Sequence, residues 1–335
     1  MIALLALVVM QGIDTLFAGY TGAAVPGASV VVIRDGRVVL RRAYGSANLE
    51  TREPATPATN YRLASLTKQF TAMAVMLLER DGKLRYDQPV REILPELPPA
   101  ARSVTIRQLL NHSSGLWDYE DLIPDTQTVQ LSDRDVLVLL SRKDTLYFAP
   151  GSTFRYSNSG YVLLGLVVER VSGIPFARFL HERIFAPLGM TATVAHVEGV
   201  DTVPRRAYGY TGSTPSDQSV TSATLGDGGI YSNVDDLVRW DQALYGSVLV
   251  DTAALGRVIT PPYGFGWFVD TYCGARRWRH HGETSGFRNE IQRFPDRRFT
   301  VIVLTNRNGG EPRAIAERIA DRLLCAPSGT PRPGG

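Results

Sequence analysis

Cysteine is scarce in this chain. Only two cysteines, Cys273 and Cys325, occur in 335 residues, so the fold cannot depend on a framework of many disulfides. The sequence leaves open whether these two pair or remain free thiols, and an exported protein would allow them to pair. The five histidines form no H-E-x-x-H pattern and the cysteines form no C-x-x-C pattern. We therefore expect no metal site and no cofactor.

Long hydrophobic runs are also missing. The longest run at the N-terminus, residues 2–10, has nine apolar residues, which is too few to span a bilayer, so no transmembrane anchor is expected. We interpret residues 1–12 as a truncated export signal, although the usual preceding basic residues are absent. The alternative is an amphipathic first helix that continues through Ile13, Leu16 and Phe17. The predicted location is the periplasm or the exterior, with the cytoplasm as the alternative.

Strong charge of one sign is absent as well. The net charge is +3, and the basic residues are scattered, so nucleic acid is not an expected partner. A content of 44% hydrophobic and 21% charged residues is typical of a globular protein, and the length favours two packed lobes. Only three of the 36 basic residues are lysines, so a motif that needs lysine rarely arises here by chance. The oligomeric state cannot be inferred from the sequence.

Strand patterns lie near the two ends of the chain. Two β-branched runs flank Asp35-Gly36 and predict a hairpin over 28–40. Four further strands are expected towards the C-terminus, at 263–271, 276–281, 289–294 and 300–305. Helices are expected at 66–82 and 312–324, and at 233–244 with Asn233 as its cap.

The middle of the chain has a different pattern. Short helical stretches at 106–110, 133–140, 160–171 and 176–184 alternate with loops rich in Pro, Gly and Ser. The predicted fold is therefore α+β: an antiparallel sheet flanked by N- and C-terminal helices, with an inserted all-helical lobe. We assign residues 13–84 and 226–325 to the sheet lobe and 85–225 to the helical lobe. The tail, 326–335, is expected to be disordered.

The segment Ser65-Leu66-Thr67-Lys68 has the pattern S-x-x-K at the start of a predicted helix. Residues three apart share one helix face, so the Lys68 amine can reach the Ser65 hydroxyl. A serine becomes a nucleophile when a neighbouring base takes its proton, and a neutral lysine can be that base. The alternative is a surface helix whose N-terminus is capped by the serine.

Two other segments carry candidate functional residues. Tyr156-Ser157-Asn158 follows a Pro-Gly turn, and a loop tyrosine can relay protons while an asparagine can hold an amide. His280-His281-Gly282 ends a predicted strand, where glycine allows another backbone to approach closely. Each segment alone is equally compatible with a purely structural role.

Together, S-x-x-K, then Y-S-N about 90 residues later, then H-x-G near the C-terminus resemble the serine β-lactamase and penicillin-binding-protein superfamily. The most similar branch contains class C β-lactamases, DD-peptidases, D-aminopeptidases and β-lactamase-like esterases. The resemblance covers about residues 20–325 and implies the β-lactamase/transpeptidase-like fold. It also implies that Ser65 is acylated, that Lys68 is its base, and that Tyr156 protonates the leaving group and activates water.

The resemblance implies binding roles for four further positions. Asn158 would orient the acyl side chain, and His280 stands where many relatives have lysine. Gly282 belongs to the third motif, and the backbone N–H of Glu283 would complete an oxyanion hole with that of Ser65. The sequence departs from the usual Lys-Thr-Gly or His-Thr-Gly because His281 replaces threonine and Glu283 follows the glycine. A glutamate there should repel a substrate carboxylate.

We therefore expect a serine hydrolase that acts through an acyl-enzyme on small esters, D-amino-acid amides or short peptides. The enzymatic alternative is a β-lactamase or DD-carboxypeptidase. A non-catalytic penicillin-binding-like module is the other alternative, and the intact set of Ser65, Lys68 and Tyr156 argues against it. The physiological substrate cannot be derived from the sequence, because one fold supports many activities.

Overall fold

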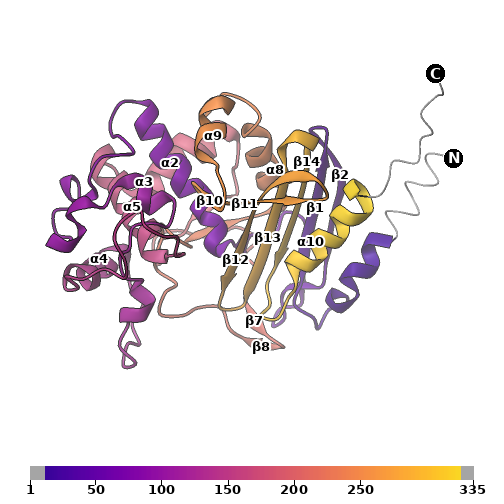
Figure 1. Cartoon of the computed structure of the whole chain (residues 1–335). Helices are drawn as coiled ribbons and strands as arrows, with labels where there is room; N and C mark the ends of the chain where they lie inside the picture. Colours follow the sequence, from indigo (N-terminus) through magenta and orange to yellow (C-terminus); the bar gives the residue numbers. More distant parts are fainter. Residues whose placement is uncertain (1–11, 326–335) are drawn as a thin grey trace, which may run out of the picture.

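The computed structural model describes residues 12–325. The predicted tail (326–335) and all but the last residue of the predicted export segment (1–12) lie outside the described residues. Seven antiparallel strands form the central sheet, in the order β10–β11–β12–β13–β14–β1–β2 (Figure 1). Their bounds are Ala28–Arg34 (β1), Arg37–Tyr44 (β2), Tyr263–Gly264 (β10), Trp267–Tyr272 (β11), Ala275–Thr284 (β12), Phe287–Phe294 (β13) and Phe299–Thr305 (β14).

Both ends of the chain build this sheet, as predicted. The turn of the first hairpin has positive φ at Asp35 and Gly36, which matches the right-handed twist of the two strands. Strand β1 then pairs with β14 in a register that places Val31 opposite Ile302. The N-terminal hairpin therefore extends a sheet that the C-terminal strands begin, and the predicted α+β fold class is confirmed.

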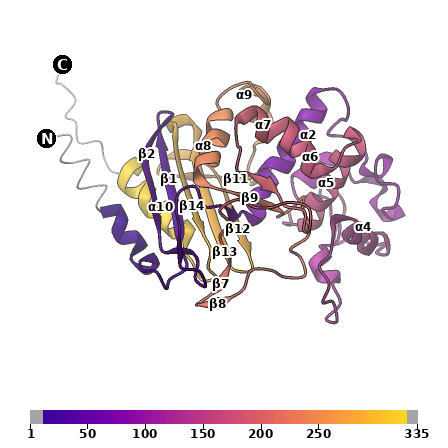
Figure 2. The same ribbon diagram turned by 180° about the vertical axis from the view of Figure 1, so that it is seen from behind.

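The strand β1 is buried on both faces, which explains its unbroken β-branched sequence. On one face, Val30 packs with Phe17 and Ile315, which come from η1 (Thr15–Tyr20) and α10 (Pro312–Ala320). On the other face, Val31 joins the larger core, which includes Trp240 of α8 (Val234–Ala243). Figure 2 shows α8 on the side of the sheet away from α10.

The other α-helices gather at the side of the sheet away from α10 (Figure 2). The α-helices are α2 (Lys68–Arg80), α3 (Ile106–Leu110), α4 (Asp133–Ser141), α5 (Asn158–Ser172), α6 (Phe176–Leu180), α7 (Ala186–Leu188) and α9 (Thr252–Val258). Short 3₁₀ or π turns are η2 (Ala64–Thr67), η3 (Val90–Glu92), η4 (Pro99–Ser103), η5 (Tyr119–Leu122), η6 (His181–Phe185), η7 (Pro295–Arg297) and η8 (Asp321–Cys325). The boundaries proposed for the two lobes remain a prediction.

Most predicted helices lie where the sequence placed them, with local differences. Asn233 caps α8 as expected, since its Oδ1 accepts a hydrogen bond from the Asp236 N–H at 2.9 Å. The helix expected over 176–184 stops being α-helical at Leu180 and continues through a π turn. The strand expected over 263–271 is split at Phe265 and Gly266, which both have positive φ.

Short strands that the sequence did not predict frame the start of α2. The strand β5 (Tyr61–Arg62) pairs with β9 (Ile230–Ser232), and β9 pairs with β6 (Val194–Ala195). The remaining pairs are β3 (Ser46–Asn48) with β4 (Glu53–Pro54), and β7 (Tyr210–Thr211) with β8 (Thr214–Pro215). The small sheet fixes residues 61–63 against 230–232, and this contact positions the S-x-x-K segment that follows.

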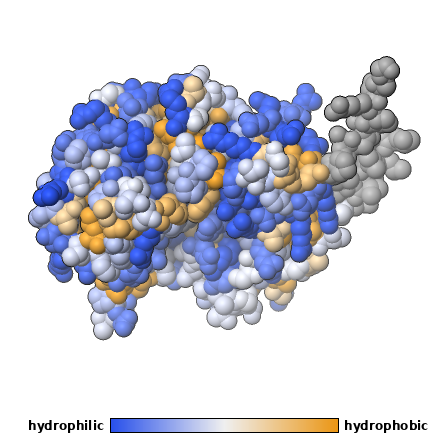
Figure 3. Space-filling model, in the orientation of Figure 1, coloured by the Kyte–Doolittle hydropathy of each residue, from blue (hydrophilic) through white to orange (hydrophobic). Residues whose placement is uncertain are grey.

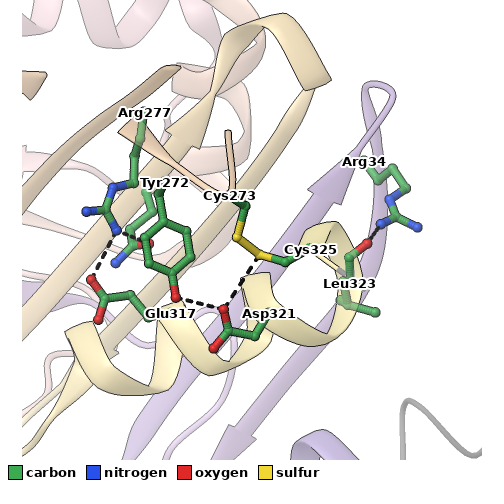
Figure 4. The surroundings of a disulfide bond; sticks show 9 residues. Arg34, Tyr272, Cys273, Arg277, Glu317, Asp321, Leu323 and Cys325 are labelled. Carbon is green, nitrogen blue, oxygen red and sulfur yellow. Dashed lines mark hydrogen bonds and ion pairs between the residues drawn. A yellow bond between two sulfur atoms is a disulfide. The ribbon is translucent and has the colours of Figure 1, made fainter. Parts of the chain in front are cut away.

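A disulfide joins the last turn of the described chain to the main sheet. Cys273, between β11 and β12, is bonded to Cys325 with a Cα–Cα distance of 5.5 Å (Figure 4). Nearby, Asp321 accepts a hydrogen bond from the Tyr272 hydroxyl at 2.7 Å. Arg277 also contacts Glu317 of α10 at 3.0 Å. The disulfide and these polar contacts fasten the C-terminal helix to the sheet. The sequence left open whether the two cysteines pair, and in the structure they do.

The face of the molecule in Figure 3 is mainly hydrophilic, with small apolar patches among polar side chains. The exposed large apolar residues come from separate parts of the chain, for example Val129, Val200 and Val248. Single exposed apolar residues are normal on a globular surface. Within residues 12–325, no single helix has the length and apolar character needed to cross a bilayer. The helix α5 and the segment 176–188 reach that length and apolar character only when they are counted together, and the chain bends sharply between them.

Candidate active site

Ser65 lies in a tight turn between β5 and α2. The preceding residue, Ala64, has a φ of 50°, which is rare for a residue with a side chain. The turn is fixed on one side, because the Leu63 N–H donates to the Ile230 carbonyl at 2.8 Å. Ser65 itself is half-buried and lines a small cavity of about 40 Å³. The strained turn therefore presents the serine hydroxyl at the edge of a cleft.

Lys68 is fully buried directly behind Ser65. Its Nζ lies 2.9 Å from the Ser65 Oγ, 2.8 Å from the Asn158 Oδ1 and 3.0 Å from the Asp227 carbonyl oxygen. The last two atoms can only accept hydrogen bonds. A neutral amine would use its two N–H groups on them and would keep its lone pair for the Ser65 proton. The spacing predicted from S-x-x-K thus gives a contact suited to general-base chemistry.

Tyr156 lies beside this pair. The Lys68 Nζ is 5.1 Å from the centroid of its ring, and the ring also packs against His112 at 4.3 Å and against Phe268 at 5.9 Å. The Tyr156 hydroxyl is buried and has no hydrogen-bond partner among the described residues. Buried polar atoms are usually paired, so an unpaired phenol next to the serine and lysine is unused hydrogen-bonding capacity.

Asn158, the first residue of α5, connects Lys68 to an acidic wall. Its Oδ1 bonds Lys68, its Nδ2 donates to Glu120 at 2.9 Å, and its backbone N–H donates to Asp118 at 2.6 Å. The oxygen and the nitrogen of its side-chain amide are therefore both hydrogen-bonded within the protein. Asp227 completes the wall: its Oδ2 accepts from the Tyr119 hydroxyl at 3.2 Å, and its Oδ1 is buried with no hydrogen-bond partner within residues 12–325.

These three carboxyl groups were not singled out from the sequence, although the segment Asp118-Tyr119-Glu120 is visibly acidic. Burial raises the pKa of Asp118 and of Glu120, and mutual repulsion with Asp227 adds to both shifts. Glu120, Asp227 and Ser65 line the same cavity. A positive group placed there would relieve this electrostatic cost.

The edge of β12 closes the other side of the cleft. A side chain at Gly282 would collide with the Leu63 carbonyl oxygen, so only glycine lets this strand approach the turn that holds Ser65. Glu283 lines the cavity next to Ser65, and its carboxylate pairs with Arg288 at 2.8 Å. Of the neighbouring arginines in the sequence, Arg279 instead bonds Asp270.

His280 is fully buried on β12. Its Nδ1 lies 2.6 Å from the His281 carbonyl oxygen, so this nitrogen carries the proton and donates, while Nε2 accepts from the Tyr263 hydroxyl at 3.0 Å. Burial holds the pKa of His280 well below its usual value, and the nearby His281 and Lys68 act in the same direction. Its ring centroid is 6.1 Å from that of Tyr156, so the two rings are neighbours without a hydrogen bond.

The second histidine, His281, is the next residue of β12, and its ring stacks on Phe268 at a centroid distance of 5.7 Å. Burial, together with Arg279, lowers the pKa of His281 as well. Both histidines are therefore mainly neutral at pH 7. Position 280 therefore carries no fixed positive charge.

Comparisons with known proteins agree with this geometry. The family model described as Beta-lactamase matches residues 13–326. The chain is 31% identical over 339 residues to penicillin-binding protein 4* of Bacillus subtilis (strain 168), covering 88% of this chain and 75% of that protein. It is 30% identical over 343 residues to the D-aminopeptidase of Cereibacter sphaeroides (strain KD131), covering 97% of this chain and 63% of that protein. This chain thus spans less than two thirds of the D-aminopeptidase.

One solved structure is similar to this chain over nearly the whole length of both. The D-amino acid amidase from Ochrobactrum anthropi SV3, complexed with D-phenylalanine, superposes with a TM-score of 0.78 and is 26% identical, covering 95% of this chain and 98% of that chain. The chain belongs to the β-lactamase family. It is a serine hydrolase of that family, and its fold is β-lactamase/transpeptidase-like.

Proposed function

We propose that this hydrolase uses Ser65 to cleave amides or short peptides that carry a free amino group next to the scissile carbonyl, with D-amino-acid amides as the leading substrates. The acidic wall beside the nucleophile carries this proposal. Glu120 and Asp227 line the Ser65 cavity, and Asp118 is close enough to both to raise the pKa of Glu120 and to have its own pKa raised by Asp227. A substrate ammonium group would neutralise charge there, whereas a carboxylate would add to the repulsion.

The proposed reaction has two halves. The Ser65 Oγ attacks the carbonyl carbon while its proton passes to the Lys68 Nζ, and the backbone N–H groups of Ser65 and Glu283 stabilise the oxyanion. The C–N bond then breaks. The leaving amine takes a proton from the Tyr156 hydroxyl, which regains one from Lys68. In the second half, Tyr156 passes its proton to the neutral Lys68 amine and takes one from a water, which attacks the ester carbonyl carbon. The C–O bond to Ser65 then breaks, Ser65 takes its proton back from Tyr156, and Lys68 returns the other proton to Tyr156.

The preference for a free amine over a carboxylate is supported by the opposite side of the cleft. His280 and His281 are mainly neutral at pH 7, so neither supplies a fixed cation for a substrate carboxylate. Glu283 adds a negative charge, which Arg288 partly offsets. The preference for the D-configuration is supported by the relatives that are named D-aminopeptidase and D-amino acid amidase.

The enzymatic alternative, a β-lactamase or DD-carboxypeptidase, is favoured by the Glu283–Arg288 ion pair, because a neutralised glutamate repels a carboxylate less. We also propose that the protein is exported to the periplasm or secreted. The disulfide between Cys273 and Cys325 supports that location, because such bonds persist in oxidising compartments.

A four-compound panel tests the substrate proposal: D-alanine amide, L-alanine amide, N-acetyl-D-alanine amide and a chromogenic cephalosporin, compared by kcat/KM. We expect D-alanine amide to exceed its N-acetyl form by tenfold or more. Glu120→Gln should reduce that ratio, mainly through KM of the free-amine substrate. Equal rates for the free and acetylated amides would contradict the role of the acidic wall, and a tenfold preference for the cephalosporin would favour the β-lactamase alternative.

A further inference from the structure

Asp133 is a buried carboxyl group that the proposed reaction does not use. It is the first residue of α4, and its two oxygens accept hydrogen bonds from two consecutive backbone N–H groups, those of Leu225 at 2.8 Å and Gly226 at 3.3 Å. The helix does not need this side chain as a cap. Ser132 and Asp135 already form a capping box with hydrogen bonds of 3.3 Å and 2.8 Å.

The segment that Asp133 holds reaches the catalytic lysine one residue later. The carbonyl oxygen of Asp227 accepts the hydrogen bond from the Lys68 Nζ at 3.0 Å. The carbonyl oxygen of Gly226 accepts from the Thr71 hydroxyl of α2 at 2.6 Å. A side chain at Gly226 would collide with the Tyr161 carbonyl oxygen of α5. The backbone at 226 is thus held by Asp133 on its N–H side and by Thr71 on its carbonyl side.

We propose that Asp133 is a positioning residue for Lys68. By fixing the peptide units of residues 225–227, it holds the Asp227 carbonyl where that oxygen takes one N–H of the Lys68 amine. Since Asn158 takes the second, the lone pair of the neutral amine is left towards Ser65. Burying a carboxyl group costs free energy unless its hydrogen bonds repay it, and here both go to this one segment. The inference rests on the roles proposed above for Ser65 and Lys68.

The hydrogen bonds from Asp133 also help to position the acidic wall. Asp227 supplies both the carbonyl oxygen that Lys68 contacts and a carboxylate that lines the Ser65 cavity. Displacement of the segment should therefore lower kcat for every substrate and raise KM only for substrates with a free amine. A residue that merely stabilises α4 would not produce this split between substrates.

The test compares Asp133→Asn with Asp135→Asn, which weakens the capping box of the same helix. The labelling is measured at pH 9, above the pKa of about 8 to which burial raises Asp133, so that both oxygens of the wild-type carboxylate accept. An asparagine at 133 keeps one acceptor but turns an NH₂ group towards a backbone N–H. We expect it to slow labelling of Ser65 by a fluorophosphonate at least tenfold and to lower kcat for a neutral ester to a similar extent. Its loss in Tm should not exceed that of Asp135→Asn, which should label at close to the wild-type rate.

Thr71→Val adds a double-mutant cycle. Thr71 and Asp133 both hold Gly226. The fold-loss in labelling rate of the double variant should therefore be smaller than the product of the fold-losses of the two single variants. Asp133→Ala is the second variant if Asp133→Asn is not recovered folded. An unchanged labelling rate in a folded variant overturns the inference, and so does failure of both variants to fold while Asp135→Asn folds. Absence of label on Ser65 in the wild type would instead overturn the proposed function.

Discussion

The amine of Lys68 lies 2.9 Å from the hydroxyl of Ser65. Its other two polar neighbours, the Asn158 side-chain oxygen and the Asp227 carbonyl oxygen, can only accept hydrogen bonds. Of the three atoms that the amine contacts, only the Ser65 Oγ carries a proton that it can give up. This alignment exists before any substrate enters, so folding supplies the free energy that orients the amine towards the hydroxyl.

The first prediction concerns this pair. Lys68→Arg keeps a positive charge, but a guanidinium does not act as a base at neutral pH, so labelling of Ser65 by a fluorophosphonate should slow by 10²-fold or more. Ser65→Ala should abolish the label. Intact-protein mass spectrometry gives the rate, and Lys83→Arg, on the surface, is the control. Retention of a third of the wild-type rate in Lys68→Arg would rule out Lys68 as the base.

The second prediction separates stability from activity at Tyr156. Its hydroxyl is buried without a partner, so Tyr156→Phe removes an unsatisfied group and should leave stability unchanged or raise it by about 1 kcal/mol. The same change removes the proposed proton relay and should reduce kcat by about 10²-fold. Urea unfolding and steady-state kinetics measure the two effects. A variant that loses stability in parallel with activity would indicate a packing role instead.

Local patterns in the sequence predicted the parts of the site that depend on local geometry. The contact between Ser65 and Lys68 follows from three-residue spacing on a helix, and the first hairpin follows from Asp35-Gly36. The strands β5 and β9 were missed, because two or three residues carry no measurable periodicity.

The acidic wall was missed for a different reason. Asp118 and Glu120 reach Asn158 across about 40 residues of sequence, so only the packing of η5 against α5 brings them together. The same holds for Tyr263, whose bond to His280 depends on the splitting of one expected strand into β10 and β11. Tertiary contacts of this kind leave no signature in a single sequence.

The third prediction concerns pH and Glu290. This residue is fully buried on β13. One carboxyl oxygen accepts from Gln292 at 3.0 Å, and the other has no partner in the part of the chain that the structure describes. Burial raises its pKa from 4.5 to about 8. Between these values the native state holds more protons than the unfolded state, so the free energy of unfolding falls as the pH rises from 4.5 to 8.

Glu290→Gln removes this titration. Relative to the wild type, the variant should become more stable across that window, by up to about 1.4 kcal/mol per pH unit. Urea unfolding at pH 5, 6.5 and 8 measures the difference. Burial also raises the pKa of Asp133 to about 8, but this group titrates in the wild type and in Glu290→Gln alike, so it does not affect the difference between them. The control is Glu311→Gln, since Glu311 is exposed and lines the same surface pocket as Glu290. A stability difference that stays constant with pH would show that Glu290 ionises normally.

The fourth prediction concerns Glu283 and Arg288. Arg288 is anchored independently of this pair, because its Nη1 donates to the carbonyl oxygens of Thr284 at 2.6 Å and Phe287 at 2.8 Å. In Glu283→Thr the guanidinium should therefore remain in place with an unpaired positive charge at the cleft. A substrate carboxylate would then gain a partner and lose a repelling neighbour. We expect the ratio of kcat/KM for a chromogenic cephalosporin to that for D-alanine amide to rise about tenfold, which corresponds to about 1.4 kcal/mol.

The double variant Glu283→Thr/Arg288→Gln should lose most of this gain, since both charges are then absent. If the ratio rises equally in the single and double variants, the effect comes from the shape of the new side chain and not from the freed arginine.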